Sequence, residues 1–237
     1  KVFVGGKLVV AHNSLVIKTS KTIIPNWIKN TVNIRKKFVE QDFVIKSKGN
    51  SASALVIRLD TEIITKMDKE DLQVKDGNVL ASFDKDVWKV AAIDRTYNTG
   101  KKTVAFLRNF GANIGAFGCT QSFHENDMIV IGSNEKDVAF VANNLSKMHG
   151  GMLVANNGVI LSKFSLPLAG LISTLPFEKT LEEYSSIDSK LIETGCKFKN
   201  PHLIPLFLPF LALPEIRILY TGVVDVKNRR YLEILNQ

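Results

Sequence analysis

Short β-branched runs separated by turn-forming residues recur along this 237-residue chain, and this pattern limits the possible folds more than any other feature. Residues 54–59 and 87–94 have the composition of strands, and Lys75-Asp76-Gly77-Asn78 predicts a turn before the next one. Residues 103–109 fit either a strand or a helix, because periodicity does not separate the two in so short a run. Further strands are predicted at residues 2–10 around a Gly5-Gly6 turn, and at residues 15–17, 43–45, 63–64, 79–80, 114–117 and 128–131.

Two segments show the 3.6-residue periodicity of amphipathic helices. The first follows Ser133-Asn134, either of which can cap it, and ends at Gly150-Gly151. Its apolar stripe consists of Val138, Val141, Ala142, Leu145 and Met148. A β-hairpin is predicted directly after it, at residues 152–161, with its turn at Asn156-Asn157-Gly158.

The second helix is predicted from about residue 177 to residue 194, with Gly195 as its stop. Its apolar side is expected to carry Leu181, Tyr184, Leu191 and Ile192. Clusters of strands with a few helices between them predict the α+β class, with mixed β-sheets.

Composition and charge exclude several classes of protein. The formal net charge is +8, but the lysines are scattered singly or in pairs and do not alternate with aromatic residues, so we expect no nucleic-acid partner. The most apolar stretch, residues 202–213, is interrupted by proline and too short to span a bilayer; we expect no membrane contact and a cytoplasmic location. Cys119 and Cys196 lie outside any C-x-x-C pair, which predicts two buried thiols.

One polar stretch lies between two apolar strands. Residues 120–127 read Thr-Gln-Ser-Phe-His-Glu-Asn-Asp, and such side chains at strand ends are typical of binding sites. An exposed connecting loop, with Asn126 and Asp127 as turn residues, is the alternative. The four histidines form neither an H-x-H nor an H-E-x-x-H pattern, so we expect no metal site in this chain.

Several short motifs occur in an order and spacing that resemble the C-terminal region of bacterial adenine deaminases. Ala91-Ala92-Ile93-Asp94-Arg95, followed by Thr99-Gly100, is similar to the strand and turn before the core of that domain. The resemblance covers nearly the whole chain. Its other pieces are Val2-Phe3-Val4-x-Gly6-Lys7-Leu8-Val9, Ile129-Val130-Ile131-Gly132, Gly150-Gly151, Gly222-Val223-Val224-Asp225-Val226, and residues 106–111, 166–173 and 208–214.

The resemblance implies a domain organisation and an activity. Residues 1–40 correspond to a segment of a small, split β domain and a linker, and residues 41–237 to a C-terminal α+β domain. The family's amidohydrolase barrel, with its divalent manganese, iron or zinc, would precede Lys1. In the full-length protein a metal-bound water would replace the 6-amino group of adenine, giving hypoxanthine and ammonia. The implied partners are this barrel, a purine-like substrate and further copies of the protein.

The polar stretch departs from the family pattern Ala-His-Asp-Ser-His-Asn. Counting back from Gly132 without a gap places Phe123 and Asn126 at the two histidine positions. A shift of one residue, with a compensating deletion, would return His124 to a histidine position. In either alignment the resemblance implies a loop at the mouth of the barrel. The candidate catalytic residues are His124 and Glu125, and the candidate substrate-binding residues are Ser122, Asn126 and Asp127.

Two other interpretations stay open. The chain could be a non-catalytic module of a divergent paralogue that binds a small molecule, or it could be an oligomerisation domain. We expect the chain on its own not to deaminate adenine, and we expect residues 2–17 to pair with strands from outside the chain.

Overall fold

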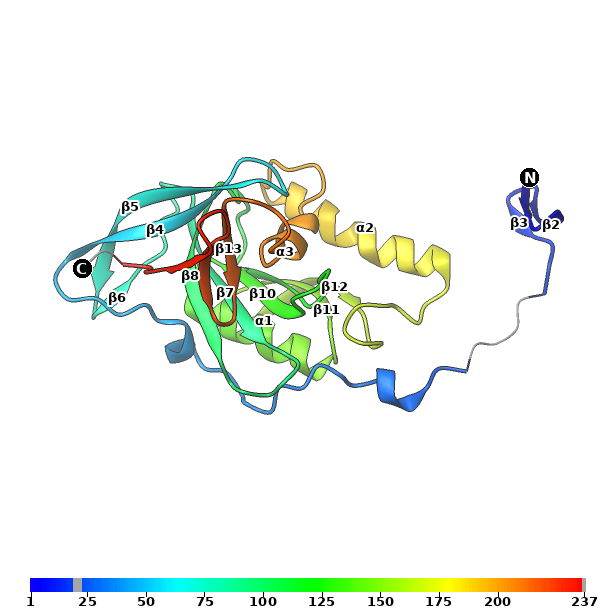
Figure 1. Cartoon of the computed structure of the whole chain (residues 1–237), viewed down its shortest axis with the longest axis horizontal. Helices are drawn as coiled ribbons and strands as arrows, with labels where there is room; N and C mark the ends of the chain where they lie inside the picture. Colours follow the sequence, from blue (N-terminus) through cyan, green and yellow to red (C-terminus); the bar gives the residue numbers. More distant parts are fainter. Residues whose placement is uncertain (19–22, 236–237) are drawn as a thin grey trace.

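One mixed sheet of nine strands organises most of the molecule (Figure 1). The structure is a computed structural model that describes residues 1–18 and 23–235. The strand order is β12-β11-β9-β10-β7-β8-β4-β5-β6, and each neighbouring pair is antiparallel except β4 and β8, which run parallel. These strands are β4 (Ser51–Leu59), β5 (Thr65–Lys75), β6 (Asn78–Val79), β7 (Val87–Asp94), β8 (Lys102–Arg108), β9 (Ala116–Cys119), β10 (Asp127–Gly132), β11 (Gly151–Asn156) and β12 (Val159–Ser165). The α+β class predicted from the sequence is confirmed.

Helices cover both faces of this sheet. Helix α1 (Glu135–Lys147) packs on one face, and α2 (Phe177–Glu193) with the short α3 (Leu203–Phe207) packs on the other. Along β10, Ile129 and Ile131 point into the cluster under α2, whereas Met128 and Val130 point into the cluster under α1. Burial on both faces explains why the central strands are continuously apolar instead of alternating with polar residues.

Helix α1 forms as its sequence predicts. The Asn134 side chain caps it by accepting a hydrogen bond from the Asp137 amide at 2.8 Å. The stripe residues Val138, Val141, Ala142 and Leu145 are buried. The Asp137 carboxylate also accepts the Asn157 and Gly158 amides, at 3.1 and 2.8 Å, and so ties the β11–β12 turn to the start of the helix.

The predicted strand at residues 43–45 is wrong. A 3₁₀ helix, η2 (Glu40–Phe43), occupies part of this segment, because the Asp42 carboxylate accepts the Val39 amide at 3.0 Å and turns the chain. The strand predicted at residues 63–64 is also wrong. Both residues lie in the loop between β4 and β5, where the Thr61 hydroxyl accepts their two amides.

Strand β5 was not predicted, because its sequence is largely charged. Its only signal is the alternation of buried Leu72 and Val74 with exposed neighbours. The ambiguous segment 103–109 is strand β8, and β9 begins two residues later than predicted. On α2 the predicted apolar side is partly wrong, since Leu181 and Ile192 are exposed. The side that packs inward is formed by Tyr184, Ile187 and Leu191.

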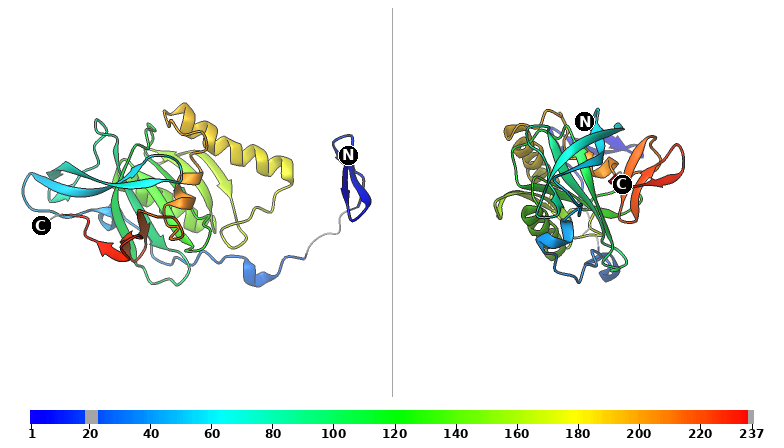
Figure 2. Two further views of the ribbon diagram at one scale, coloured as in Figure 1. Left: turned by 45° about the horizontal axis from the view of Figure 1, so that its top comes forward. Right: turned by 90° about the vertical axis from the view of Figure 1, so that its left-hand side faces the viewer.

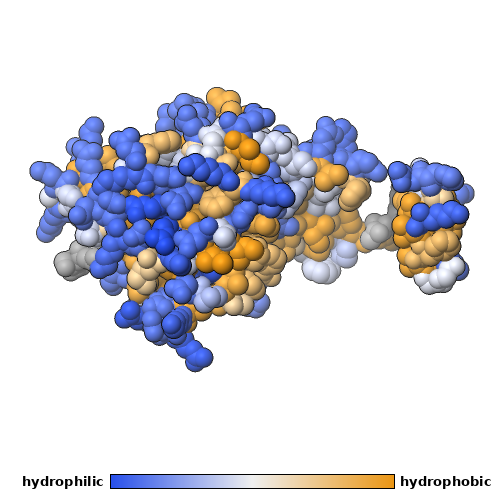
Figure 3. Space-filling model, turned by 90° about the horizontal axis from the view of Figure 1, so that it is seen from above, coloured by the Kyte–Doolittle hydropathy of each residue, from blue (hydrophilic) through white to orange (hydrophobic). Residues whose placement is uncertain are grey.

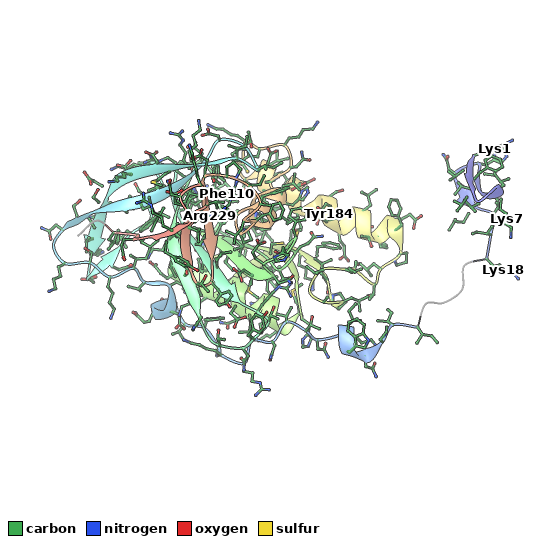
Figure 4. All side chains as sticks on the ribbon, in the orientation of Figure 1. Lys1, Lys7, Lys18, Phe110, Tyr184 and Arg229 are labelled. Carbon is green, nitrogen blue, oxygen red and sulfur yellow. The ribbon has the colours of Figure 1, made fainter. Side chains whose placement is uncertain are left out.

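Two small antiparallel sheets complete the fold. Strands β13 (Ile216–Leu219), β14 (Gly222–Asp225) and β15 (Arg230–Leu232) pack on the α2 side of the large sheet. Strands β1 (Val2–Val4), β2 (Lys7–Ala11) and β3 (Ser14–Leu15) confirm the predicted N-terminal hairpin. This sheet lies apart from the rest in Figure 1 and in the left view of Figure 2. In Figure 4, Lys1, Lys7 and Lys18 mark this separate part, and Phe110 and Tyr184 mark the main body.

The remaining features bear on the other sequence predictions. A 3₁₀ turn, η1 (Asn26–Ile28), lies within the predicted linker. Cys119 and Cys196 are buried and unbonded, as predicted. In the described part of the chain, no helix combines the length and the apolar character that crossing a bilayer requires.

Candidate functional site

The polar stretch connects β9 to β10 at one end of the large sheet. Strand β10 begins at Asp127, directly opposite Asp94 at the end of β7. This register brings Asp94 and Arg95 beside residues 120–127, although they are far apart in the sequence. We call residues 120–127 the polar loop.

Arg95 links the polar loop to the turn at Ala169, which follows β12. Its guanidinium Nη2 donates to Asn126 Oδ1 at 3.2 Å, and its Nη1 donates to the Ala169 carbonyl at 3.0 Å. Arg95 is 2% exposed, and burial lowers its pKa to about 10, so it stays charged at neutral pH. Gly170 makes this contact possible, because a Cβ there would lie 2.8 Å from Arg95 Nη1.

Asp127 and Asp94 are neighbouring buried carboxylates with opposite pKa shifts. Burial raises the pKa of Asp127 to about 7, and the charges of Asp94 and Glu125 add to this effect. The Tyr220 amide, which donates to Asp127 Oδ2 at 2.9 Å, opposes it. Burial also acts to raise the pKa of Asp94, but hydrogen bonds from the hydroxyl of Thr99 and from backbone amides of the turn after β7 outweigh it and hold the pKa low.

Ser122 and Asn126 hold the shape of the polar loop. The Asn126 amide donates to Ser122 Oγ at 3.1 Å, and Asn126 Nδ2 donates to the His124 carbonyl at 3.1 Å. Asn126 adopts a positive φ of 59°, which asparagine tolerates better than most residues. In this structure Ser122 Oγ and Asn126 Nδ2 therefore make hydrogen bonds within the loop, while Asn126 Oδ1 accepts from Arg95.

His124 and Glu125 point in different directions. The His124 side chain is 86% exposed, whereas the Glu125 side chain is 10% exposed, and His124 Nδ1 lies 4.0 Å from Glu125 Oε1. Glu125 Oε1 accepts the Leu211 amide at 3.0 Å, and Glu125 Oε2 is buried without a hydrogen-bond partner among the described residues. The imidazole is therefore exposed to solvent, whereas the largely buried carboxylate holds the loop to Leu211.

Phe123 makes two aromatic contacts at the tip of the polar loop. Its ring lies 4.8 Å from that of Phe207 and 5.3 Å from that of Phe210, and its side chain is 54% exposed. Such tilted ring pairs are stabilising contacts. They attach the tip of the polar loop to α3 and the segment that follows it.

Across residues 1–18 and 23–235, no three or more His, Cys, Asp and Glu side chains are grouped so as to hold a metal ion. The side chains in these two ranges therefore do not fit a divalent-metal centre.

Comparison with known proteins identifies the family. Residues 62–230 match the family model described as the adenine deaminase C-terminal domain. The chain belongs to this family. It is 43% identical over 234 residues to the adenine deaminase of Cenarchaeum symbiosum (strain A), which covers 99% of this chain and 38% of the relative. It is 31% identical over 236 residues to the adenine deaminase of Clostridium botulinum (strain Langeland / NCTC 10281 / Type F), covering 99% of this chain and 39% of the relative.

A relative with lower sequence identity is also an adenine deaminase and also matches nearly the whole chain. The adenine deaminase of Moorella thermoacetica (strain ATCC 39073 / JCM 9320) is 26% identical over 239 residues, which covers 99% of this chain and 40% of the relative. The chain thus spans about two fifths of the length of these curated relatives. Its family is one of deaminating hydrolases, and the matched region includes Arg95 and the whole polar loop.

In this adenine deaminase C-terminal domain, sequence reasoning found the polar loop but missed the residues that hold it. The sequence places Arg95 only in a family motif, and it does not mark Tyr220 or Leu211 as partners of the loop. The sequence does contain one signal, an Asp-Arg pair at the end of a buried strand. The backbone donors from Tyr220 and Leu211 leave no side-chain pattern, so only the tertiary structure reveals them.

Proposed function

We propose that this chain is the C-terminal part of a metal-dependent aminohydrolase that converts adenine and water into hypoxanthine and ammonia. The observation that carries the proposal is the 43% identity to an adenine deaminase over 99% of the chain, together with the family match at residues 62–230. The manganese, iron or zinc ligands that such an activity needs are assigned to an amidohydrolase barrel in the N-terminal part of the full-length protein. On this proposal, residues 1–237 alone do not deaminate adenine.

Residues 1–40 are proposed to form a linker and a segment of a small β domain that strands from outside this chain complete, with residues 41–237 forming the C-terminal domain. Support comes from the exposure of apolar side chains in the sheet β1–β3. Val2, Phe3, Val4 and Leu15 are 48–63% exposed, so this sheet has no hydrophobic core of its own. Three such strands are marginal without a covering layer.

The polar loop is proposed to lie at the mouth of the active site of the full-length protein. His124 is assigned a proton-transfer role because its side chain is 86% exposed and a neutral imidazole carries both a proton donor and a proton acceptor nitrogen. Glu125 is assigned to the catalytic group as well, with its Oε2 free to hydrogen-bond beyond Leu211. Ser122, Asn126 and Asp127 are assigned to the substrate side of the loop. Of these, Asp127 is the one whose burial and pKa near 7 support proton exchange at neutral pH.

Further copies of the protein are the proposed oligomeric partners. Strand β12 is an edge of the large sheet, and its residues Val159, Ile160 and Leu161 are 61%, 39% and 40% exposed. An exposed apolar edge strand can pair with the same strand of another copy.

The test is a kinetic comparison in the full-length protein with added divalent metal. Ammonia release from adenine and a panel of other purines is measured for the parent and for His124→Asn and Glu125→Gln. Both variants should lower kcat/KM by at least roughly tenfold, about 1.4 kcal/mol of transition-state stabilisation. His12→Asn is the matched control, because His12 is exposed in the turn between β2 and β3, outside the part of the chain that carries the polar loop, and has a positive φ that asparagine tolerates.

Each outcome has a distinct meaning. Parental kinetics in both loop variants would show that the polar loop is only a connector. Absence of turnover with every purine in the parent would refute the deaminase proposal. It would favour the second candidate, a non-catalytic small-molecule-binding or oligomerisation module.

A further inference from the structure

The small sheet β13–β15 carries a groove on its outward face. Val223 pairs with Ile218 and Leu232, and these three side chains pack into the core. Because side chains alternate along a strand, Val224 and its pairing partner Tyr231 point to the opposite face. A groove of about 480 Å³ lies there, between the sheet and the segment that follows α3. Its floor is apolar and is formed by Leu211, Leu219, Val224 and Val226.

Two arginines and a tyrosine complete the lining of this groove. Arg229, Arg230 and Tyr231 are consecutive, and the Cα atoms of the first and the last are at most about 7 Å apart, so one small ligand can contact all three. Apolar residues reach the molecular surface in several places (Figure 3), and single ones need no explanation. An apolar floor combined with a few polar groups and an aromatic ring is, in contrast, typical of a small-molecule site.

The Tyr231 ring is held in place although it is 63% exposed. It packs across Gly222, where a Cβ would lie 2.6 Å from Tyr231 Cδ1, so only glycine leaves room for the ring. The Tyr231 hydroxyl lies 3.2 Å from Thr221 Oγ1, which fixes the other end of the side chain. An exposed ring in a fixed position offers a face on which a flat heteroaromatic group can stack.

The turn between β14 and β15 gives the two arginines different surroundings. Asp225 holds this turn by accepting the Asn228 amide at 3.1 Å and the Asn228 side-chain nitrogen at 2.7 Å. Arg230 Nε lies 3.4 Å from Asp225 Oδ2, so one carboxylate offsets part of the charge of Arg230. The Arg229 guanidinium forms no hydrogen bond or ion pair with any residue in the ranges 1–18 and 23–235. Two guanidinium groups beside a single carboxylate make the groove favourable for an anion, and guanidinium matches phosphate with two parallel hydrogen bonds.

We propose that this groove binds a nucleoside monophosphate, with the base stacked on Tyr231 over the apolar floor and the phosphate on Arg229 and Arg230. The ligand needs both parts, because inorganic phosphate alone would leave the apolar floor uncovered. A nucleoside without phosphate would leave the Arg229 guanidinium without an anion. The inference goes beyond the proposed deamination and does not depend on it, since it concerns binding to the sheet β13–β15.

The test measures the binding of adenosine monophosphate, adenosine and inorganic phosphate to the full-length protein by calorimetry. The parent should bind adenosine monophosphate at least tenfold more tightly than either of the other two. Arg229→Asn should remove the preference for adenosine monophosphate over adenosine, and asparagine tolerates the positive φ of 51° at this position. Tyr231→Leu keeps an apolar side chain but loses the stacking face, and should weaken the binding of adenosine monophosphate roughly tenfold.

Lys227→Asn is the matched control, because it removes one positive charge from an exposed position in the same turn that does not line the groove. It should bind adenosine monophosphate as the parent does. Hydrogen exchange locates the site, since bound adenosine monophosphate should slow exchange at least threefold in peptides that cover residues 219–231.

Three results would overturn the inference. Equal weakening by Lys227→Asn and Arg229→Asn would show a general attraction of anions to a basic turn. Inorganic phosphate that binds as tightly as adenosine monophosphate would show that the base is not recognised. Binding without slower exchange in residues 219–231 would place the nucleotide elsewhere in the protein. None of these measurements requires turnover of adenine, so failure of this inference and failure of the deaminase proposal are distinguishable.

Discussion

Replacing Asp127 by asparagine should remove the loss of stability that this buried carboxyl causes as the pH rises from about 4 to about 7. The carboxyl is 2% exposed, and its pKa rises from the ordinary 3.8 to about 7 because burial disfavours the charged form. The charged groups that act on it are Asp94, Glu125 and Arg95, and the Tyr220 amide donates to it. Asparagine keeps an acceptor for that amide but carries no charge.

The direction in which stability changes with pH follows from proton binding. Between the two pKa values the folded protein keeps the proton and the unfolded chain loses it, so the folded state binds more protons there. This stabilisation is complete below about pH 4 and is lost as the pH rises through about 7. The slope is at most about 1.4 kcal/mol per pH unit, and over the whole interval the loss is at most about 4 kcal/mol. Relaxation of the site will reduce both values.

The assay is denaturant unfolding of residues 1–237 at several pH values from 5 to 8. Between pH 5 and 7 the parent should lose at least about 1 kcal/mol more unfolding free energy than Asp127→Asn does. Asp84→Asn, at an exposed position, is the control and should follow the parent. Equal pH dependence of the parent and Asp127→Asn would refute the argument, because it would mean that Asp127 is ionised throughout this range in the folded protein.

Two further predictions concern the framework behind the site. Asn134→Ala should lower the unfolding free energy by about 1 kcal/mol, because it removes the side-chain acceptor of the Asp137 amide at the start of α1. Asn134→Ser should keep most of the parent's stability, since serine can also cap the helix. Equal stability of the parent and both variants would contradict the capping role. Lys89→Met should cost about 2–3 kcal/mol, because Lys89 is 1% exposed and its ammonium pairs with Glu135 and donates to Asn78 Oδ1 at 2.9 Å. Thermal unfolding measures both, and an unchanged Lys89→Met variant would show that the buried ion pair contributes nothing net.

Sequence by itself determined the elements whose signal is local. Strand β7 and helix α1 could be placed because a run of β-branched residues and a capped 3.6-residue stripe each specify their own backbone. The polar loop could be singled out for the same reason, as a polar run between two apolar strands. The family motifs could likewise be recognised from the sequence, because they consist of consecutive residues in a fixed order.

Only the tertiary structure decided how these strands, helices and loops contact one another. The charged strand β5 exists because β4 and β6 pair with it, and residues 43–45 are not a strand because Asp42 caps a turn there. Arg95 reaches the polar loop only because β7 and β10 are neighbours in the sheet, and Asp127 acquires a pKa near 7 only when burial removes it from water. These effects depend on long-range pairing and desolvation, which a local stretch of sequence does not encode.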